Sequence, residues 1–166
     1  MKSLKNLHIL QTLNWRTMGS LICLMLFSFL GNTLQAQCAA DAGMLMPDPA
    51  VSDQCINEGE TVTFWGAHVP GNYPTVPTGF ELIYVLTKGT DLVIVDTNKD
   101  PFFIVSMEGN YTVHTLVYDP STLDLGIVVP GVTTGFDVNA LLIQGGGDIC
   151  AALDVAGAPF SVTACD

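Results

Sequence analysis

The sequence predicts an all-β sandwich with one short helix before its last strand, preceded by a signal peptide. Three observations lead to this prediction. Short apolar runs rich in Val, Ile, Phe and Tyr recur along the chain, and clusters of Gly, Pro, Asn and Asp separate them. The N-terminal region combines basic residues with an apolar run. Four of the five cysteines lie beyond that run, as in small exported domains that rely on disulfides.

Residues 1–36 are predicted to be a signal peptide. Basic residues precede the apolar run Leu21–Leu30, and Ala36 is the expected last residue before cleavage. The run is shorter than the roughly 20 apolar residues that span a bilayer, although a retained anchor is the alternative. We therefore expect one mature domain, residues 37–166, that is secreted or held at the cell surface and does not span the membrane.

The strands are expected where β-branched and aromatic residues cluster between turn residues. They are Ala42–Met46, Thr61–Gly66, Phe80–Thr87, Asp91–Asp96, Phe102–Ser106, Tyr111–Tyr118 and Pro159–Ala164. Lys88-Gly89-Thr90 is expected to join two of these strands as a tight hairpin, because glycine accepts the backbone conformation of such turns.

Phe136–Gln144 is the segment with helical spacing. Val138, Leu141 and Leu142 fall on one face of the expected helix, and Asp137 is suited to cap its start. We therefore expect one amphipathic helix before the last strand.

Three consecutive glycines, Gly145 to Gly147, follow that helix. A phosphate-binding glycine loop needs a strand before it and a helix after it, so that backbone N–H groups face the anion. The order here is reversed, and no Gly-Lys-Ser/Thr follows. The glycines are therefore expected to end the helix and turn the chain.

The mature chain is strongly acidic. Signal cleavage leaves only Lys88 and Lys99 against all 16 acidic residues, a net charge of −14. Nucleic acid and anionic lipid need Lys and Arg to neutralise their phosphates. We therefore expect no nucleic-acid partner.

Two stretches resemble immunoglobulin-like domains. GETVTFWG is similar to strand B of that fold, with Gly66 at the position of the usual cysteine. GNYTVHTLVYD is similar to the tyrosine corner that enters strand F, with Gly109 in the turn, Tyr111 as the corner residue and Val113 at the second cysteine position. The resemblance implies an immunoglobulin-like antiparallel β-sandwich in which Tyr111 and Gly109 are structural and the usual B–F disulfide is absent.

The region 37–166 as a whole is similar to the immunoglobulin- or PKD-like repeats of secreted Bacteroidetes surface proteins. YVLTKG, GNYTVHTLVYD and GGGDICAALDVAGAPFSV carry the resemblance. It implies a non-catalytic module with a structural or adhesive role at the cell surface, whose partner is an unknown surface protein or glycan. A carbohydrate-binding module and a small secreted hydrolase are the alternatives.

The four cysteines beyond the signal are expected to form two disulfides, because an even number in an exported chain is typical of a disulfide framework. A zinc site is the alternative, although no two of them have the close spacing of zinc ligands. The immunoglobulin-like topology implies the pairing, since its first and last strands run parallel. It places Cys38 beside Cys150 and Cys55 beside Cys165, whereas pairing of sequence neighbours is the alternative.

Few residues suggest a ligand or a reaction. Asp96, Asn98 and Asp100 alternate as in calcium loops, but the glycine and bidentate glutamate of such loops are missing, and a solvated turn is the alternative. No serine lies in a Gly-x-Ser-x-Gly motif, so no catalytic residue and no cofactor are expected. Trp65 and Tyr73 could stack on sugars or anchor a protein partner, whereas Trp65 covering the sandwich edge is the alternative.

His68 and His114 are the two histidines beyond the signal. His68 is expected in a loop before Pro70, and His114 on the strand face opposite Tyr111. Neither has a carboxylate at ligand spacing, so surface positions are expected rather than a metal role.

Overall fold

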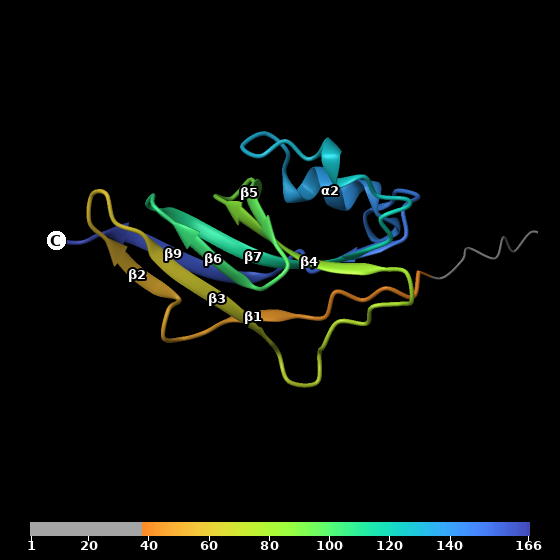
Figure 1. Cartoon of the computed structure of the whole chain (residues 1–166), viewed down its shortest axis with the longest axis horizontal. Coiled ribbons are helices and arrows are strands. Elements are labelled where there is room, and N and C mark those ends of the chain that lie inside the picture. Colours follow the sequence, from red (N-terminus) through yellow and green to blue (C-terminus); the bar gives the residue numbers. More distant parts are fainter. Residues whose placement is uncertain (1–37) are drawn as a thin grey trace, which may run out of the picture. The chain divides into compact units, whose positions relative to one another are not determined.

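Most of the regular structure consists of β-strands in two sheets, as the computed structural model of residues 38–166 shows. The predicted signal peptide and its cleavage site lie outside the described residues. One sheet has three strands in the order β1-β3-β6, and the larger sheet has the order β2-β9-β7-β4-β5, with β8 also paired to β7 (Figure 1). The strands are β1 (Leu45–Pro47), β2 (Asp53–Ile56), β3 (Val62–His68), β4 (Glu81–Lys88), β5 (Val93–Asn98), β6 (Phe102–Val105), β7 (Gly109–Tyr118), β8 (Ala151–Leu153) and β9 (Ala158–Ala164).

The strands expected from the sequence all lie within a few residues of observed ones, and β4 and β5 form the expected hairpin. Two strands were not among those predicted with bounds: β2, and β8, which was expected only as a strand-like segment after the three glycines. Their sequences, DQCI and AAL, contain few of the β-branched and aromatic residues that signal a strand. They form because β9 and β7 offer them backbone partners, β2 running parallel to β9 and β8 antiparallel to β7.

A first core fills the space between the two sheets. Phe64 is fully buried there, stacked on Phe160 with ring centroids 4.4 Å apart and packed on the Tyr111 ring at 5.7 Å. At the position of the usual cysteine, a Cβ on Gly66 would lie 3.5 Å from the Leu45 side chain. The side chains of Leu45 and Ala158 therefore pack against Gly66.

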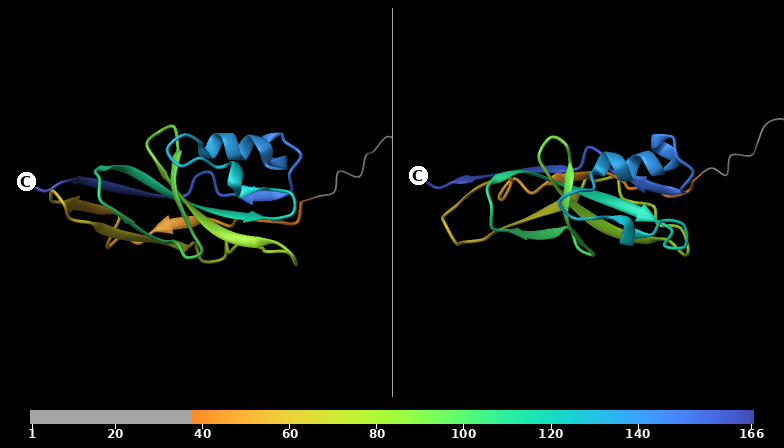
Figure 2. Two further views of the ribbon diagram at one scale, coloured as in Figure 1. Left: turned by 45° about the horizontal axis from the view of Figure 1, so that its top comes forward. Right: turned by 90° about the horizontal axis from the view of Figure 1, so that it is seen from above.

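A second core lies on the opposite face of the larger sheet, which the sequence-based prediction of a two-layer sandwich did not include. The segment that follows β7 covers this face with the 3₁₀ helices η1 (Leu125–Ile127) and η2 (Ile143–Gly145) and the helix α2 (Gly135–Leu141), as Figure 2 shows. In β4, Ile83 and Val85 point into this second core. The larger sheet is therefore buried on both faces.

The start of α2 differs from the prediction. Thr134, not Asp137, is the N-cap: its side chain accepts a hydrogen bond from the Asp137 N–H at 3.1 Å. The Asp137 carboxylate accepts the Thr134 N–H in return at 2.9 Å. Asp137 is thus the third helical residue of a reciprocal capping box rather than the cap itself.

The end of α2 also differs, because the helix stops at Leu141. Leu142 has extended backbone angles (φ −83°, ψ 151°), so its buried side chain leaves the helical spacing. Leu141 is exposed and does not share a buried face with Val138 and Leu142, as had been expected. Gly146 then adopts a φ of +96° beyond η2, and the glycines turn the chain toward β8 as predicted.

Candidate functional site

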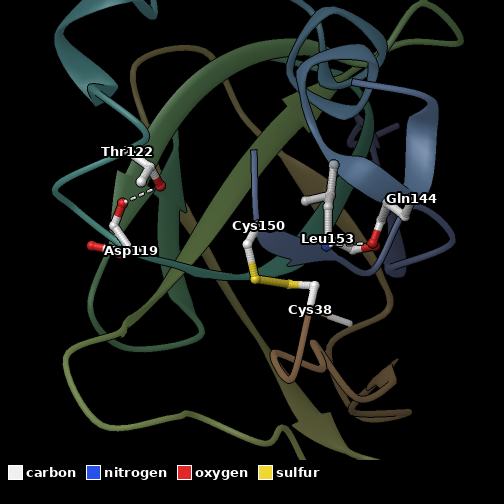
Figure 3. The surroundings of a disulfide bond; sticks show 6 residues. All are labelled: Cys38, Asp119, Thr122, Gln144, Cys150 and Leu153. Atoms are coloured by element: carbon white, nitrogen blue, oxygen red, sulfur yellow. Dashed lines mark hydrogen bonds between the residues drawn. A yellow bond between two sulfur atoms is a disulfide. The ribbon is translucent and has the colours of Figure 1, made fainter. Parts of the chain in front are cut away.

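Two disulfides join distant parts of the chain. Cys38, ahead of β1, is bonded to Cys150, the residue before β8, across a sequence separation of 112 (Figure 3). Cys55 in β2 is bonded to Cys165, the residue after β9, across a separation of 110. This is the pairing implied by parallel first and last strands. The four cysteines beyond the predicted signal are thus paired in two disulfides, so the zinc alternative is wrong.

Tyr111 and Gly109 form the corner where the chain enters β7. The Tyr111 hydroxyl donates to the Met107 carbonyl oxygen at 2.8 Å, and its side chain is only 3% exposed. Gly109 has a φ of +150°, and a Cβ there would lie 2.5 Å from Cε of Lys88. Lys88 in turn lies over the Tyr111 ring, with Nζ 5.3 Å from its centroid. Tyr111 and Gly109 therefore both have structural roles at this corner.

His114 is buried, so its expected surface position is wrong. It is 2% exposed in the second core, with Nδ1 2.8 Å from the Asp154 carbonyl oxygen and Nε2 2.9 Å from Thr87 Oγ1. Because a carbonyl only accepts, Nδ1 donates, and the Thr87 hydroxyl donates to Nε2 of a neutral ring. Burial lowers the pKa of His114, and the carbonyl and charge of Asp154 offset this in part. His114 is thus a neutral link between strands.

Asp154 is a further buried polar residue that sequence reasoning missed. Its carboxylate accepts the Leu45 N–H of β1 at 2.9 Å and the Gly157 N–H at 3.2 Å. It therefore connects the turn between β8 and β9 to the other sheet. A short acidic residue followed by Gly two or three positions later is an ordinary turn signal, but only the fold shows that the same carboxylate reaches β1.

His68 ends β3 rather than lying in the predicted loop, and it is half-buried. Its Nε2 lies 3.0 Å from the hydroxyl of Tyr84. Burial, together with the nearby charge of Asp100, raises the pKa of Tyr84. The Tyr84 hydroxyl therefore stays protonated at ordinary pH, and the two side chains fill the end of the space between the sheets.

The calcium hypothesis finds no support in the geometry. The Asn98 side chain closes the turn from β5 to β6, because it donates to the Phe102 carbonyl at 2.9 Å and accepts the Lys99 N–H at 2.7 Å. Asp96 accepts the N–H of its neighbour Thr97 at 2.8 Å. Within residues 38–166, no group of three or more His, Cys, Asp or Glu side chains is placed to hold a metal ion. Asp96, Asn98 and Asp100 therefore belong to a solvated turn, which was the alternative to a calcium site.

Trp65 and Tyr73 do not form one binding pair. Trp65 points outward from the three-stranded sheet, and its indole N–H donates to Asp48 at 3.1 Å. Tyr73 lies in the loop after β3, with its ring 6.2 Å from that of His68, whose position on β3 has the opposite parity. The two aromatic side chains are therefore on different faces of the strand.

The outward side of the three-stranded sheet carries a set of exposed apolar side chains, here called the apolar outer face. Its members and their exposed fractions are Met46 (41%), Trp65 (38%), Phe102 (43%) and Ile104 (57%). Strand pairing gathers them, since Trp65 lies opposite Phe102, and Thr63 lies opposite Ile104. Exposed apolar groups that cluster in this way are typical of interaction surfaces.

Sequence reasoning identified Trp65 in this surface but not its neighbours. The run Phe102–Val105 is apolar at every position, which a strand needs only if both of its faces are covered or one faces a partner. Phe103 and Val105 are buried while Phe102 and Ile104 are exposed. The uninterrupted apolar run of a strand at the sheet edge was the signal that could have found the surface.

A small cavity of about 20 Å³ lies in the second core, between α2 and the larger sheet. Its walls are mostly apolar, and its polar members are Thr97 and the pair His114 and Thr87, which are hydrogen-bonded to each other. The volume suits at most one water molecule. It is a packing defect rather than a ligand site.

Comparison with known proteins adds no relative: no family model, no curated protein and no solved structure matches the chain. Among the described residues, no helix is both long and apolar enough to cross a bilayer.

Proposed function

We propose that the protein is an exported, non-catalytic immunoglobulin-like module with a structural or adhesive role at the cell surface, similar to the repeats of secreted Bacteroidetes proteins. The apolar outer face on a disulfide-braced sandwich is the observation that carries the proposal. A sandwich braced in this way can present a sheet surface to a partner without a conformational change and without reactive side chains.

The strand arrangement supports the immunoglobulin-like part of this proposal. A small sheet β1-β3-β6 packs on a larger one in which β9, β7, β4 and β5 are neighbours. The Tyr111 corner opens the strand that the resemblance likened to strand F. The departures are the third layer formed by α2 and its neighbours and the apolar contact at Gly66 where a disulfide would lie.

The roles of the buried polar side chains support a non-catalytic module. His114 and Asp154 are among the most deeply buried polar residues, and both bond to backbone or hydroxyl groups of the framework. Their polar atoms are occupied within the fold and do not converge on an open cavity. Their chemistry stabilises the sandwich.

Export is supported by the two disulfides, which are typical of oxidising compartments. The acidic charge keeps such a domain soluble outside the cell. A carbohydrate-binding role is the second candidate, because Trp65 and Phe102 are exposed cross-strand neighbours on one sheet face. Met46 and Ile104 in the same surface favour a polypeptide partner, since they supply no hydrogen bonds for sugar hydroxyls.

The test is to express the full chain with a C-terminal tag in an exporting bacterial host and to follow its location and its adhesion. We expect residues 1–36 to be absent from the exported protein, and cells that display it to adhere to protein-coated surfaces. The double variant Trp65→Ser/Phe102→Ser should reduce adhesion, whereas the control Ile127→Ser/Val132→Ser, at apolar sites that are even more exposed but lie outside the apolar outer face, should not.

An intact N-terminus in the cytoplasm would overturn the export part of the proposal. Binding on a glycan array that depends on Trp65 would favour the carbohydrate-binding alternative. Hydrolysis of ester, peptide or glycoside substrates by the purified protein would favour the small secreted hydrolase.

A further inference from the structure

We infer that the open edge of β6, together with the apolar outer face, binds an extended and positively charged segment of another polypeptide as an added strand. The inference rests on the proposed adhesive function and names the kind of partner that this surface fits. Its basis is the backbone hydrogen-bonding pattern at β6, the side chains beside that edge and the charge of the chain.

The hydrogen bonds of β3 show which backbone groups of β6 point outward. The Trp65 carbonyl of β3 accepts from Asp48 on the β1 side, whereas the Gly66 N–H donates to the Pro101 carbonyl on the β6 side at 3.0 Å. Antiparallel pairing alternates along a strand, so Phe103 and Val105 direct their backbone groups to β3. Phe102 and Ile104 direct theirs to the open edge.

At that edge the backbone of Phe102 is already occupied, but that of Ile104 is not. The Phe102 N–H donates to the Asp100 carbonyl at 2.8 Å, and its carbonyl accepts from the Asn98 side chain at 2.9 Å. Outside the β3–β6 ladder, no hydrogen bond among residues 38–166 uses the N–H or the carbonyl of Ile104. Ile104 therefore offers both groups that an incoming strand needs.

Two other strand edges, those of β5 and β8, are closed by the chain itself. The edge of β5 is covered by residues 131–135, because Ile94 exchanges backbone hydrogen bonds with Thr133 and Gly131. In β8, the Gln144 side chain bonds both the N–H and the carbonyl of Leu153, at 3.1 and 2.9 Å (Figure 3). These are ways in which proteins prevent edge-to-edge pairing. On β6 such closure is limited to Phe102, and the edge is open at Ile104.

The side chains beside the open edge suit an apolar strand. Ile104 is 57% exposed, and together with Phe102 it lies next to Trp65 on the apolar outer face. The Trp65 ring is held in place by its hydrogen bond to Asp48. An added strand would extend this surface and cover part of it, which gives side-chain affinity in addition to the backbone pairing.

Charge selects the partner. Residues 38–166 contain 16 acidic residues and only Lys88 and Lys99 as basic ones. A second copy of this chain would bring together two molecules of strongly negative net charge, which repel each other, whereas Lys or Arg residues on the incoming segment would be attracted. The partner is therefore a basic, extended polypeptide and not another copy of the chain.

The experiment titrates the purified disulfide-bonded protein, labelled for amide NMR, with a short acetylated peptide of alternating Val and Lys. We expect saturable shifts at Phe102–Val105 and at the Trp65 indole N–H, and loss of binding in about 0.5 M NaCl. A matched peptide of alternating Val and Glu should not bind.

Two variants separate the backbone from the side chain. Ile104→Pro removes an N–H that β3 does not use, and proline is tolerated at such an edge position, so affinity should fall about tenfold with the fold retained. Ile104→Thr keeps the N–H but removes apolar surface and should weaken binding less. Ile127→Thr is the matched control, because Ile127 is equally exposed (55%) but lies in η1.

Absence of saturable binding, or binding that Ile104→Pro leaves unchanged, would overturn the inference. Self-association of the protein that Ile104→Pro abolishes would show that a second copy occupies the edge instead. Either result leaves the location and adhesion of the displayed protein to be judged by their own assay, so failure here is distinct from failure of the proposed function.

Discussion

Replacing Tyr111 with Phe tests the corner that the sequence resemblance pointed to. The change removes one hydroxyl and leaves the ring against Phe64 in the first core, so it isolates the hydrogen bond from the Tyr111 hydroxyl to the Met107 carbonyl at 2.8 Å. A hydrogen bond of this kind contributes about 1 kcal/mol to the free energy of unfolding. Water can reach the Met107 region once the hydroxyl is gone, because the Met107 side chain is exposed. The loss in the free energy of unfolding should therefore stay at about 1 kcal/mol rather than reach the cost of an unsatisfied buried carbonyl.

Urea unfolding followed by tryptophan fluorescence measures this loss as a lower midpoint with an unchanged slope. For a domain of this size, about 1 kcal/mol corresponds to a fall of about 4 °C in Tm. Tyr73→Phe is the matched control, since Tyr73 is 63% exposed and its hydroxyl makes no hydrogen bond to the described residues. An unchanged midpoint for Tyr111→Phe, or an equal loss for Tyr73→Phe, would refute the reasoning.

Three further predictions concern buried groups and covalent bonds. Asp154→Ala should destabilise the domain by about 2–3 kcal/mol in urea, because it leaves the buried N–H of Leu45 and that of Gly157 without their acceptor, and Asp154→Asn should cost less. The lowered pKa of His114 means that the unfolded chain binds its proton more readily, so the stability that neutral His114 contributes is present above about pH 6.5 and is lost as pH falls below it. Unfolding measured from about pH 5 to 7.5 should show this slope, and His114→Gln should flatten it. Replacing both Cys55 and Cys165 with Ala should cost up to about 4–5 kcal/mol, judged by calorimetry, because their bond closes a loop of 110 residues; an unchanged Tm would contradict the prediction.

Local sequence patterns were sufficient for features that depend on neighbouring residues. The β4–β5 hairpin, the glycine turn after the helix and the Tyr111 corner each require particular residue types within a few positions. The short strand β2 was not predicted, because its pairing with β9 rather than its own composition holds it in place.

The candidate surface could be predicted only in part. Trp65 was identified as a binding candidate, but its partners Phe102 and Ile104 were assigned to a strand without regard to which side would be covered. The pairing with Tyr73 was wrong, since a loop carries Tyr73 to the His68 side of β3. The sequence shows which side chains of a strand share a face, because they alternate. It does not show which segment, if any, packs on each face.

By itself, the sequence determined the β-rich class, the approximate strands and the acidic charge, because these follow from residue type and short-range order. The parallel relation of first and last strands, once the resemblance was accepted, was enough to pair Cys38 with Cys150. Only the tertiary structure decided that α2 covers the second face of the larger sheet, which buries His114, and that no element within residues 38–166 covers the outward side of β3 and β6. The physical reason is that burial depends on distant segments packing together, and the same alternating strand is stable with either face covered.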